Sequence, residues 1–444
     1  MLDQSFSADN FRRILDLANR KGVHVEEKFS MTAIRDINKQ IKECNNDLRI
    51  KRKAGDSEAI NALYEKKKKL RDQKDLMLQS ELEKVSQKIA DKSFRIELKE
   101  VKIPNKKTLY TTPNTPEHFF ALKQIQHNLA RLFGVKQANR NSIIEQVISL
   151  VGDNFPKHII RTDIENFYES IPHKPLLQKI HRDNLLTPLS RKILTDVLKS
   201  YNDKSGTDKG IPRGIGVSAY LAELYMRDID NDILDLPGVT YYARYVDDII
   251  IIFTPSPGEE GRNYLQEVRE CVEKRQVHLN DQKTDSIDLS TTTVTRSFSY
   301  LGYHIIFSKR EVSTKLTDSK INKYKTRIES AFNHYVNYSK IDEKSARKIL
   351  VKRIRFLTGN TRLTNNKKNI LVGIYYSNAQ LTNTEQLNDI YDFLVDQISQ
   401  KITSPHLKAR LKKYKFLTGF GDKRFSPFTT EELSEIMEVW QKPY

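Results

Sequence analysis

The sequence of 444 residues contains little cysteine, with Cys44 and Cys271 as its only two thiols. Two widely separated thiols cannot form a disulfide framework or a zinc site, so both are expected to be structural residues in a reducing compartment. Long apolar runs are also missing, because no stretch of about 18 apolar residues occurs. We find no secretory signal and no lipidation motif at either end. The sequence therefore predicts a soluble, cytoplasmic protein without a membrane partner.

Acidic residues are too few to balance the basic ones. Asp and Glu number 57 against 75 Lys and Arg, which gives a formal net charge of +18. Such an excess is typical of proteins that bind polyanions, and nucleic acid is the first partner that it suggests. The length is that of one large domain with several parts, or of two to three smaller domains. No internal repeat occurs at a fixed period.

Three regions of the chain differ in composition. We expect a helical N-terminal extension over residues 1–100, a mixture of strands and helices over residues 101–310, and a mostly helical, basic region over residues 311–444. Within the first region, a pair of helices is expected to turn near Ala54-Gly55-Asp56.

Short apolar segments in the middle region have the pattern of strands. Residues 158–163 form one such run, which ends at Asp163, and residues 298–306 are predicted to form another. Ser142 and Glu145 have the spacing of a capping box, so a helix is expected to begin near Ser142. The segment 210–218 contains three glycines and a proline, which would let its backbone approach a neighbour closely.

Residues 240–253 contain two apolar, β-prone runs on either side of Asp247 and Asp248. This pattern predicts a hairpin whose buried strands place two carboxylates at an exposed tip. Adjacent like charges repel each other unless they share a cation, which makes the pair a candidate metal site. A solvated acidic turn is the alternative, and the pair alone does not decide between them. The run Ile249–Phe253 is, however, too apolar for an ordinary surface loop.

Asp163, Asp247 and Asp248 together suggest a specific chemistry. Two Mg²⁺ ions about 4 Å apart need several carboxylate oxygens, and such ion pairs stabilise the attacking and leaving oxygens of an in-line phosphoryl displacement. The order of the motifs around these acids resembles the palm of the reverse transcriptases, over about residues 106–306. The motifs are the strand that ends at Asp163, the turn at 210–218, Tyr245-Val246-Asp247-Asp248, Leu279-Asn280 with Lys283, and Tyr300-Leu301-Gly302.

This resemblance implies a fold and a metal site. The fold would be an α+β right-hand polymerase, with fingers, a palm containing an antiparallel sheet, and a helical thumb, extended by helices at both ends. Asp163 and Asp247 would bridge two Mg²⁺ ions, Asp248 would be a weaker ligand, and the Ile164 carbonyl would complete the ligand shell. Residues 298–305 match the primer-grip region, where a hairpin holds the primer end.

The resemblance also implies roles in nucleotide binding. Tyr168 matches the aromatic residue that lies under the incoming sugar, where a flat ring leaves no volume for a 2′-hydroxyl. Lys283 resembles the lysine near the departing pyrophosphate, although a solvated loop lysine is equally compatible. Lys106 and Lys107 fall where basic residues contact the triphosphate; we prefer Lys107, and Arg140 is a further candidate.

Departures from the family pattern concern the turn after the first aspartate. Many members carry Pro-Gln-Gly where this chain has Pro212-Arg213-Gly214, and Arg213 can pair with a phosphate or with a carboxylate. The sequence Leu221-Ala222-Glu223 resembles the bacterial abortive-infection and defence-associated reverse transcriptases. Residues after 310 lack cysteine and Cys/His ligand spacing, so an intron-type HNH domain with zinc knuckles is not expected, and neither is an RNase H domain.

The resemblance predicts an RNA-directed DNA polymerase that makes cDNA from dNTPs on an RNA template, such as a dedicated non-coding RNA, in bacterial antiphage defence. Its partners would be the template and the DNA product, and a second protein component or a homo-oligomer remains open. DNA synthesis without a template, or primed by a protein side chain, is one alternative. An RNA-binding scaffold with an idle palm is an alternative of another class. RNA synthesis is disfavoured because Tyr168 would obstruct a ribose.

Overall fold

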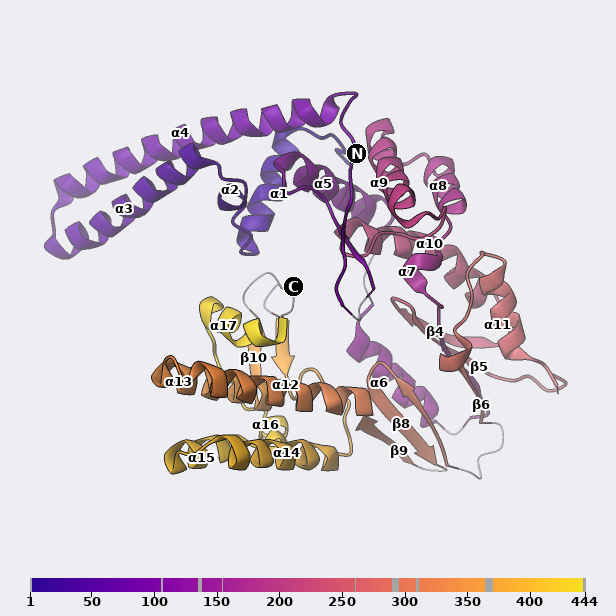
Figure 1. Ribbon diagram of the computed structural model, residues 1–444. Coiled ribbons are helices and arrows are strands. Elements are labelled where there is room, and N and C mark those ends of the chain that lie inside the picture. The colour runs from indigo at the N-terminus through magenta and orange to yellow at the C-terminus, as the bar shows by residue number, and fades with distance from the viewer. Residues whose placement is uncertain are drawn as a thin grey trace. The chain divides into compact units, whose positions relative to one another are not determined.

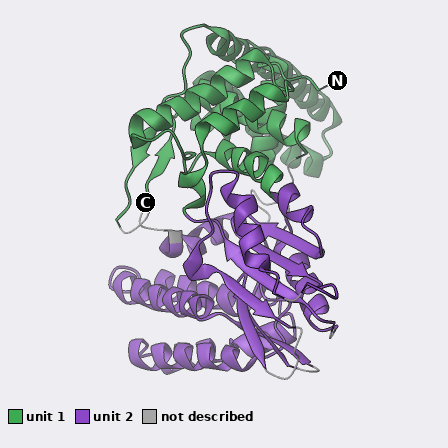
Figure 2. Ribbon diagram, turned by 90° about the vertical axis from the view of Figure 1, so that its right-hand side faces the viewer, with its two compact units in different colours: residues 1–136, 166–229 green, residues 137–165, 230–444 purple. Residues whose placement is uncertain are grey.

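The computed structural model describes residues 2–104, 107–134, 138–153, 155–259, 261–289, 295–308, 311–363 and 370–441. The chain forms two compact units, residues 1–136 with 166–229 (unit 1) and residues 137–165 with 230–444 (unit 2) (Figure 2). The division by role into residues 1–100, 101–310 and 311–444 stays a prediction. None of the described helices combines the length and the apolar character that a bilayer-spanning segment requires.

Unit 1 is mostly helical. Its elements are α1 (Ala8–Arg20), α2 (Val25–Lys28), α3 (Thr32–Ala54), α4 (Ser57–Ala90), β1 (Lys99–Val101), β2 (Leu109–Thr111), α5 (Pro116–Leu132), α7 (Phe167–Ser170), α8 (His173–Arg182), α9 (Pro188–Ser205) and α10 (Gly216–Leu234), which contains the unit boundary. The predicted helical pair is confirmed as α3 and α4, which lie side by side (Figure 1). Gly55 ends α3 with a φ of 73°, and the Asp56 carboxylate caps α4 by accepting the Ala59 N–H.

Unit 2 contains the larger sheets and the C-terminal helices. Its elements are α6 (Arg140–Val151), β3 (His158–Asp163), β4 (Val239–Tyr245), β5 (Asp248–Phe253), α11 (Tyr264–Glu273), the 3₁₀ turn η1 (Asp281–Lys283), β6 (Asp285–Asp288), β7 (Arg296–Tyr300), β8 (Tyr303–Ser308), β9 (Glu311–Leu316), α12 (Asp318–Tyr338), α13 (Glu343–Thr358), β10 (Asn360–Leu363), β11 (Ile370–Gly373), α14 (Glu385–Lys401), α15 (Pro405–Lys412), α16 (Phe416–Gly421) and α17 (Thr430–Gln441). The mixture of helices and sheets confirms the predicted α+β class.

An antiparallel sheet with the strand order β4-β5-β3-β6 lies at the centre of the predicted palm. The side chains of Ile249–Phe253 in β5 are fully buried, because this strand has a hydrogen-bonded neighbour on both sides and is apolar on both faces. The predicted hairpin is confirmed: β4 and β5 pair in antiparallel register up to Tyr245 and Asp248. The two acids of the Asp-Asp pair are therefore at its tip.

Two predicted element positions were wrong, and the C-terminal region is mostly helical as predicted. Helix α6 begins at Arg140 and not near Ser142, because the Asn139 side chain caps it by accepting the N–H groups of Asn141 and Ser142. Residues 298–306 do not form one strand, because Leu301 and Gly302 adopt positive φ values of 45° and 77° and turn the chain between β7 and β8. The C-terminal region contains the antiparallel pair β10–β11 in addition to its helices.

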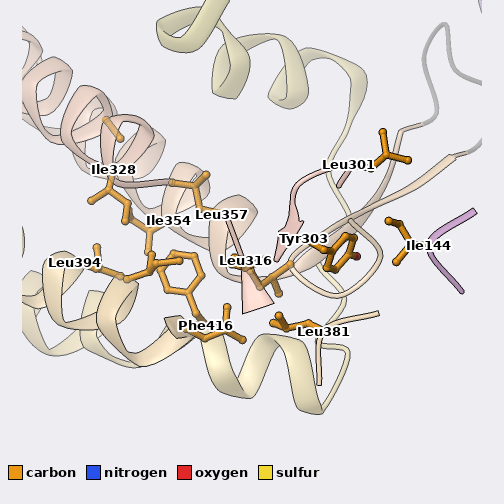
Figure 3. Close-up of a cluster of buried hydrophobic side chains, with 14 of the residues drawn as sticks. Ile144, Leu301, Tyr303, Leu316, Ile328, Ile354, Leu357, Leu381, Leu394 and Phe416 are labelled. Carbon is orange, nitrogen blue, oxygen red and sulfur yellow. The ribbon is translucent and has the colours of Figure 1, made fainter. Parts of the chain in front are cut away.

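The core of unit 2 joins the three-stranded sheet β7-β8-β9 to the C-terminal helices. Ile328 of α12, Ile354 of α13, Leu394 of α14 and Phe416 of α16 are fully buried and point toward one another (Figure 3). Leu316 at the end of β9 belongs to the same cluster. Because each fully buried large apolar side chain contributes about 1.5–3 kcal/mol, this cluster fixes the helices on the sheet.

Candidate active site

Unit 2 brings the three predicted acids together at one end of two neighbouring strands. Asp163, the last residue of β3, is the register partner of Asp248, the first residue of β5. The Ile164 N–H donates a hydrogen bond of 3.3 Å to the Asp247 carbonyl, which fixes the third acid at the same strand end. Val246, between the strands, adopts a φ of 63°, a conformation that β-branched residues rarely take. The hairpin tip is thus a strained turn held by the strands beneath it.

Asp163 is the most enclosed of the three acids. Its side chain is 4% exposed, and one of its carboxylate oxygens accepts a hydrogen bond from the Lys283 ammonium. Its other oxygen, Oδ1, is buried and has no hydrogen-bond partner among the residues that the structure describes. The contact with Asp163 raises the pKa of Lys283, so this lysine stays charged at neutral pH.

The Asp248 carboxyl is electrostatically unfavourable as an anion. Burial and the neighbouring charge of Asp247 raise its pKa, and Arg161 opposes them only in part. Arg161 Nη2 lies 3.8 Å from Asp248 Oδ1, while its Nη1 donates to the Lys283 carbonyl at 2.6 Å. The Tyr300 hydroxyl donates to the Asp248 carbonyl at 3.4 Å. The three aspartates therefore carry more negative charge than Lys283 and Arg161 neutralise.

The arrangement of the three aspartates fits a bound cation best at the Oδ1 atom of Asp163. A buried carboxylate oxygen without a partner costs free energy that a metal ion at that oxygen would recover. Within the described ranges, no three His, Cys, Asp or Glu side chains converge as a ready metal cage. The fit therefore rests on Asp163 Oδ1 and on the raised pKa of Asp248, with Asp247 beside it.

Three other predicted site residues, Lys107, Tyr168 and Arg213, form a second cluster, in unit 1. The Glu169 carboxylate accepts hydrogen bonds from Arg213 Nε at 2.5 Å, from Arg213 Nη2 at 3.0 Å and from Lys107 Nζ at 3.0 Å. Lys107 Nζ also donates to Asn166 Oδ1 at 2.9 Å. The Arg213 guanidinium carbon lies 4.8 Å from the centre of the Tyr168 ring. Of the two partners predicted for Arg213, the structure shows the carboxylate, and Lys106 lies outside the described residues.

The glycine-rich turn makes the close backbone approach that its composition suggested. Gly214 has a φ of 97°, and a Cβ atom built there would lie 2.7 Å from the Tyr110 carbonyl oxygen of β2. The Tyr110 N–H donates to the Arg213 carbonyl at 2.7 Å, and the Ile211 N–H donates to the Tyr168 carbonyl at 2.6 Å. Backbone contacts thus hold the two residues of the stacked pair, Tyr168 and Arg213, from both sides.

We expect the Glu169→Gln substitution to lower the stability of the chain at neutral pH by about 1 kcal/mol, because Arg213 and Lys107 lose their shared anion. Burial raises the pKa of Glu169, but the hydrogen bonds from Arg213 and Lys107 outweigh it and lower the pKa below its usual 4.5. The stabilisation is therefore complete above pH 4.5 and is lost as the pH falls through the lowered pKa.

The measurement is the thermal midpoint of the wild-type chain and of the variant between pH 7 and pH 3. The two midpoints should differ at pH 7 and converge at the acid end. Glu97→Gln, which removes an exposed glutamate of the same unit, serves as the control and should have no such effect. A difference that stays constant with pH would show that the charge of Glu169 contributes nothing.

The structure adds residues that the sequence interpretation missed. Arg161 precedes Asp163 by two residues on β3, so the alternation of side chains along a strand would have placed it on the same face. Arg244 donates to both carboxylate oxygens of Asp230 at 2.8 Å and to the Val246 carbonyl at 2.8 Å, a pairing that no local spacing announces. Arg140 was already a predicted candidate for contact with the triphosphate; it lies in unit 2, where its Nε donates a hydrogen bond of 2.8 Å to the Leu301 carbonyl.

The solved structures that are similar to this chain include two telomerases. One is an apo telomerase from Candida tropicalis truncated from the C-terminal domain, with 12% identity and a TM-score of 0.37 over 50% of this chain and 55% of that one. The other is a telomerase from Candida albicans in complex with a TWJ fragment of telomeric RNA, with 10% identity and a TM-score of 0.35 over 79% and 64%. This chain spans less than two thirds of either. A comparison with curated proteins found no match.

A family model described as reverse transcriptase (RNA-dependent DNA polymerase) matches residues 121–305. The matched segment contains the strand that ends at Asp163, the glycine-rich turn, the Asp247-Asp248 hairpin and Lys283. The family match and the geometry of the acids thus agree on the same residues. Residues 121–305, less than half of the chain, are therefore similar in sequence to the reverse transcriptases.

Proposed function

We propose that the whole chain copies an RNA template into DNA from dNTPs, with Asp163, Asp247 and Asp248 as its catalytic acids. The observation that supports this most strongly is the pairing of Asp163 with Asp248 at the ends of buried strands, inside the segment that matches the family model. The excess of basic residues supports a nucleic-acid substrate.

The three aspartates and the Ile164 carbonyl would hold two divalent ions, proposed to be Mg²⁺, which supply stabilisation for the attacking and leaving oxygens of nucleotidyl transfer. Lys283 would neutralise charge on the departing pyrophosphate or donate a proton to it, and its raised pKa keeps that proton available at neutral pH. Tyr168 would exclude a 2′-hydroxyl, with Arg213 stacked on its ring and Glu169 orienting Arg213. Lys107, which also binds Glu169, would contact the triphosphate.

Arg244 is expected to position the hairpin tip. Its side chain is 7% exposed, and it links Asp230 to the carbonyl of Val246, which directly precedes Asp247. Arg244→Lys keeps the charge but lacks the three separated nitrogens through which Arg244 contacts Asp230 and the Val246 carbonyl. We expect kcat to fall by about tenfold to a hundredfold while KM for dNTP changes little, since a displacement of about 1 Å at catalytic groups has effects of that size.

Steady-state nucleotide incorporation measures this effect. The control is Tyr242→Phe, which removes a hydrogen bond of 2.5 Å to the same Asp230 carboxylate but leaves the Val246 contact in place. It should lower kcat less than Arg244→Lys does. Equal kcat values for Arg244→Lys and the wild-type chain would show that Arg244 does not position the tip.

The experiment that tests the proposed function is extension of a labelled DNA primer on an RNA template of known sequence. The product should be complementary to the template, should lack covalently attached protein and should not form when the template is omitted. Product of unrelated or single-nucleotide sequence would establish synthesis without a template, and protease-sensitive product would establish priming by a side chain. Nucleic-acid binding without any incorporation would leave an idle scaffold as the correct account.

We further propose that the enzyme acts in bacterial antiphage defence on a dedicated non-coding RNA. The support is the sequence Leu221-Ala222-Glu223, which resembles the defence-associated branch. Phage plating on bacteria that carry the wild-type coding sequence with its natural flanking DNA should fall relative to bacteria that carry the Asp247→Asn/Asp248→Asn variant. Equal plating across a broad phage panel would contradict this role. RNA that co-purifies with the chain would identify the template.

A further inference from the structure

The C-terminal helices of unit 2 form an open cavity of 350 Å³, lined mainly by α13 and α15. Its volume lies within the range of about 300–1,000 Å³ that is usual for ligand sites. The cavity is lined by residues beyond position 346, whereas the family match ends at residue 305. The cavity therefore lies outside the segment that matches the family model.

The cavity wall carries five Lys or Arg side chains and a single carboxylate, Glu432. Two of the five cations have anionic partners: Arg347 pairs with Glu343 at 2.5 Å, and Lys352 pairs with Glu432 at 3.3 Å and with Glu435 at 3.1 Å. The three others are Lys348, Arg355 and Arg410. Within the described ranges, no carboxylate lies within ion-pair distance of these three.

The wall beneath these cations is packed and apolar. Val351, Leu407 and Phe428 all line the cavity and are less than 9% exposed. The Arg355 guanidinium carbon lies 5.6 Å from the centre of the Phe428 ring, and Arg355 also interacts with the Glu432 carboxylate from beyond ion-pair distance. Lys348 and Arg410 are exposed on two helices that a common core fixes. The backbone positions of these cations are therefore fixed by packed helices.

We propose that this cavity binds a phosphate group of a nucleic-acid strand. Two guanidinium groups with no described carboxylate within ion-pair distance, Arg355 and Arg410, suit the oxygens of a phosphate, which guanidinium binds through paired hydrogen bonds. Lys348 adds a third charge. The site would anchor a strand through its backbone at a position outside the segment that matches the family model, so it would raise affinity without reading sequence.

The test is equilibrium binding of the full-length chain to labelled RNA and to DNA of the same sequence, with EDTA present and dNTPs absent. Lys348→Glu/Arg410→Glu reverses two unpaired cations of the cavity. Lys344→Glu/Lys408→Glu makes the same change of charge on the same two helices, at residues that do not line the cavity. The cavity variant should bind about tenfold more weakly or worse, and its slope of log affinity against log salt should be smaller by about 1. The control should bind within about twofold of the wild-type chain.

The outcomes separate the sources of the phosphate and the competing explanations. A loss confined to RNA identifies an RNA strand as the ligand, and an equal loss for RNA and DNA identifies any strand; both support the site. An equal loss in the control variant, or no loss in the cavity variant, would overturn it. The proposal would also be overturned if the cavity variant lost binding of a labelled acidic peptide while its binding of RNA and DNA stayed unchanged. If the charge reversal lowers the thermal midpoint, Lys348→Gln/Arg410→Gln is judged by the same criteria. Because no nucleotide is incorporated in this assay, failure here is distinct from failure of the proposed polymerase.

Discussion

Asp163→Asn is expected to lower the rate of nucleotide incorporation by about a thousandfold or more, with little change in thermal stability. The carboxylate is 4% exposed, its Oδ2 contacts Lys283, and its Oδ1 has no partner among the described residues. The amide keeps the shape of the side chain but removes the charge on which the proposed catalytic cations depend. A loss of about 4 kcal/mol of transition-state stabilisation corresponds to that factor.

Stability should respond differently, since the wild-type carboxylate is an incompletely satisfied buried anion. We expect the thermal midpoint of Asp163→Asn to stay within about 3 °C of the wild-type value or to rise. Asp285→Asn is the matched control, because it makes the same chemical change at the exposed start of β6, next to β3 in the sheet. It should retain most of the activity. A large fall in the midpoint of Asp163→Asn with activity preserved would make Asp163 a structural residue.

Tyr168→Ala is the second substitution with a large expected effect, and it acts on selectivity. Without the ring, a ribonucleotide should be incorporated about a hundredfold more readily relative to its deoxy counterpart, as expected when a steric exclusion is removed. Tyr168→Phe should retain discrimination, because the phenyl ring keeps the excluded volume. Loss of the Arg213 contact, 4.8 Å above the ring, would let the ring move and should weaken discrimination to a smaller degree.

The measurement is the ratio of kcat/KM for dNTP and rNTP in single-nucleotide incorporation, for the wild-type chain, Tyr168→Ala, Tyr168→Phe and Arg213→Ala. The order of discrimination should be wild type and Tyr168→Phe first, Arg213→Ala next and Tyr168→Ala last. Unchanged discrimination between dNTP and rNTP in Tyr168→Ala would show that Tyr168 does not exclude the 2′-hydroxyl. Loss in Tyr168→Phe would instead attribute selectivity to the hydroxyl group.

The hairpin and its acids were predictable from local pattern. A run such as Ile249–Phe253 is too apolar for a loop, and an acid pair between two β-prone runs has to lie at a turn. The register that places Asp163 opposite Asp248 is not a local property, because it depends on pairing between β3 and β5. The proximity of Asp163 and Asp248 was expected only because the order of the motifs resembles that of the reverse transcriptases. Physical pattern alone left the metal site and the acidic turn equally open.

Contacts between charged residues that lie far apart in the chain could not be predicted from the sequence. Glu169 lies next to Tyr168 in the chain, but nothing local predicts that it would bind both Lys107 and Arg213. The same holds for Arg244 and Asp230, whose pairing depends on the packing of the last turn of α10 against the sheet. Element ends were misjudged where one side chain decided them, as Asn139 does for α6. Such capping competes with neighbouring candidates that look equally suitable in sequence.

The most direct measurement of the central claim is incorporation of dNTPs on an RNA template by the wild-type chain and by Asp247→Asn/Asp248→Asn, as Mg²⁺ is varied and then removed with EDTA. The wild-type rate should rise with Mg²⁺ and disappear with EDTA, and the double variant should remain inactive at every concentration while keeping the wild-type thermal midpoint within about 3 °C. Full activity of the double variant would contradict the assignment of the hairpin tip as the catalytic centre.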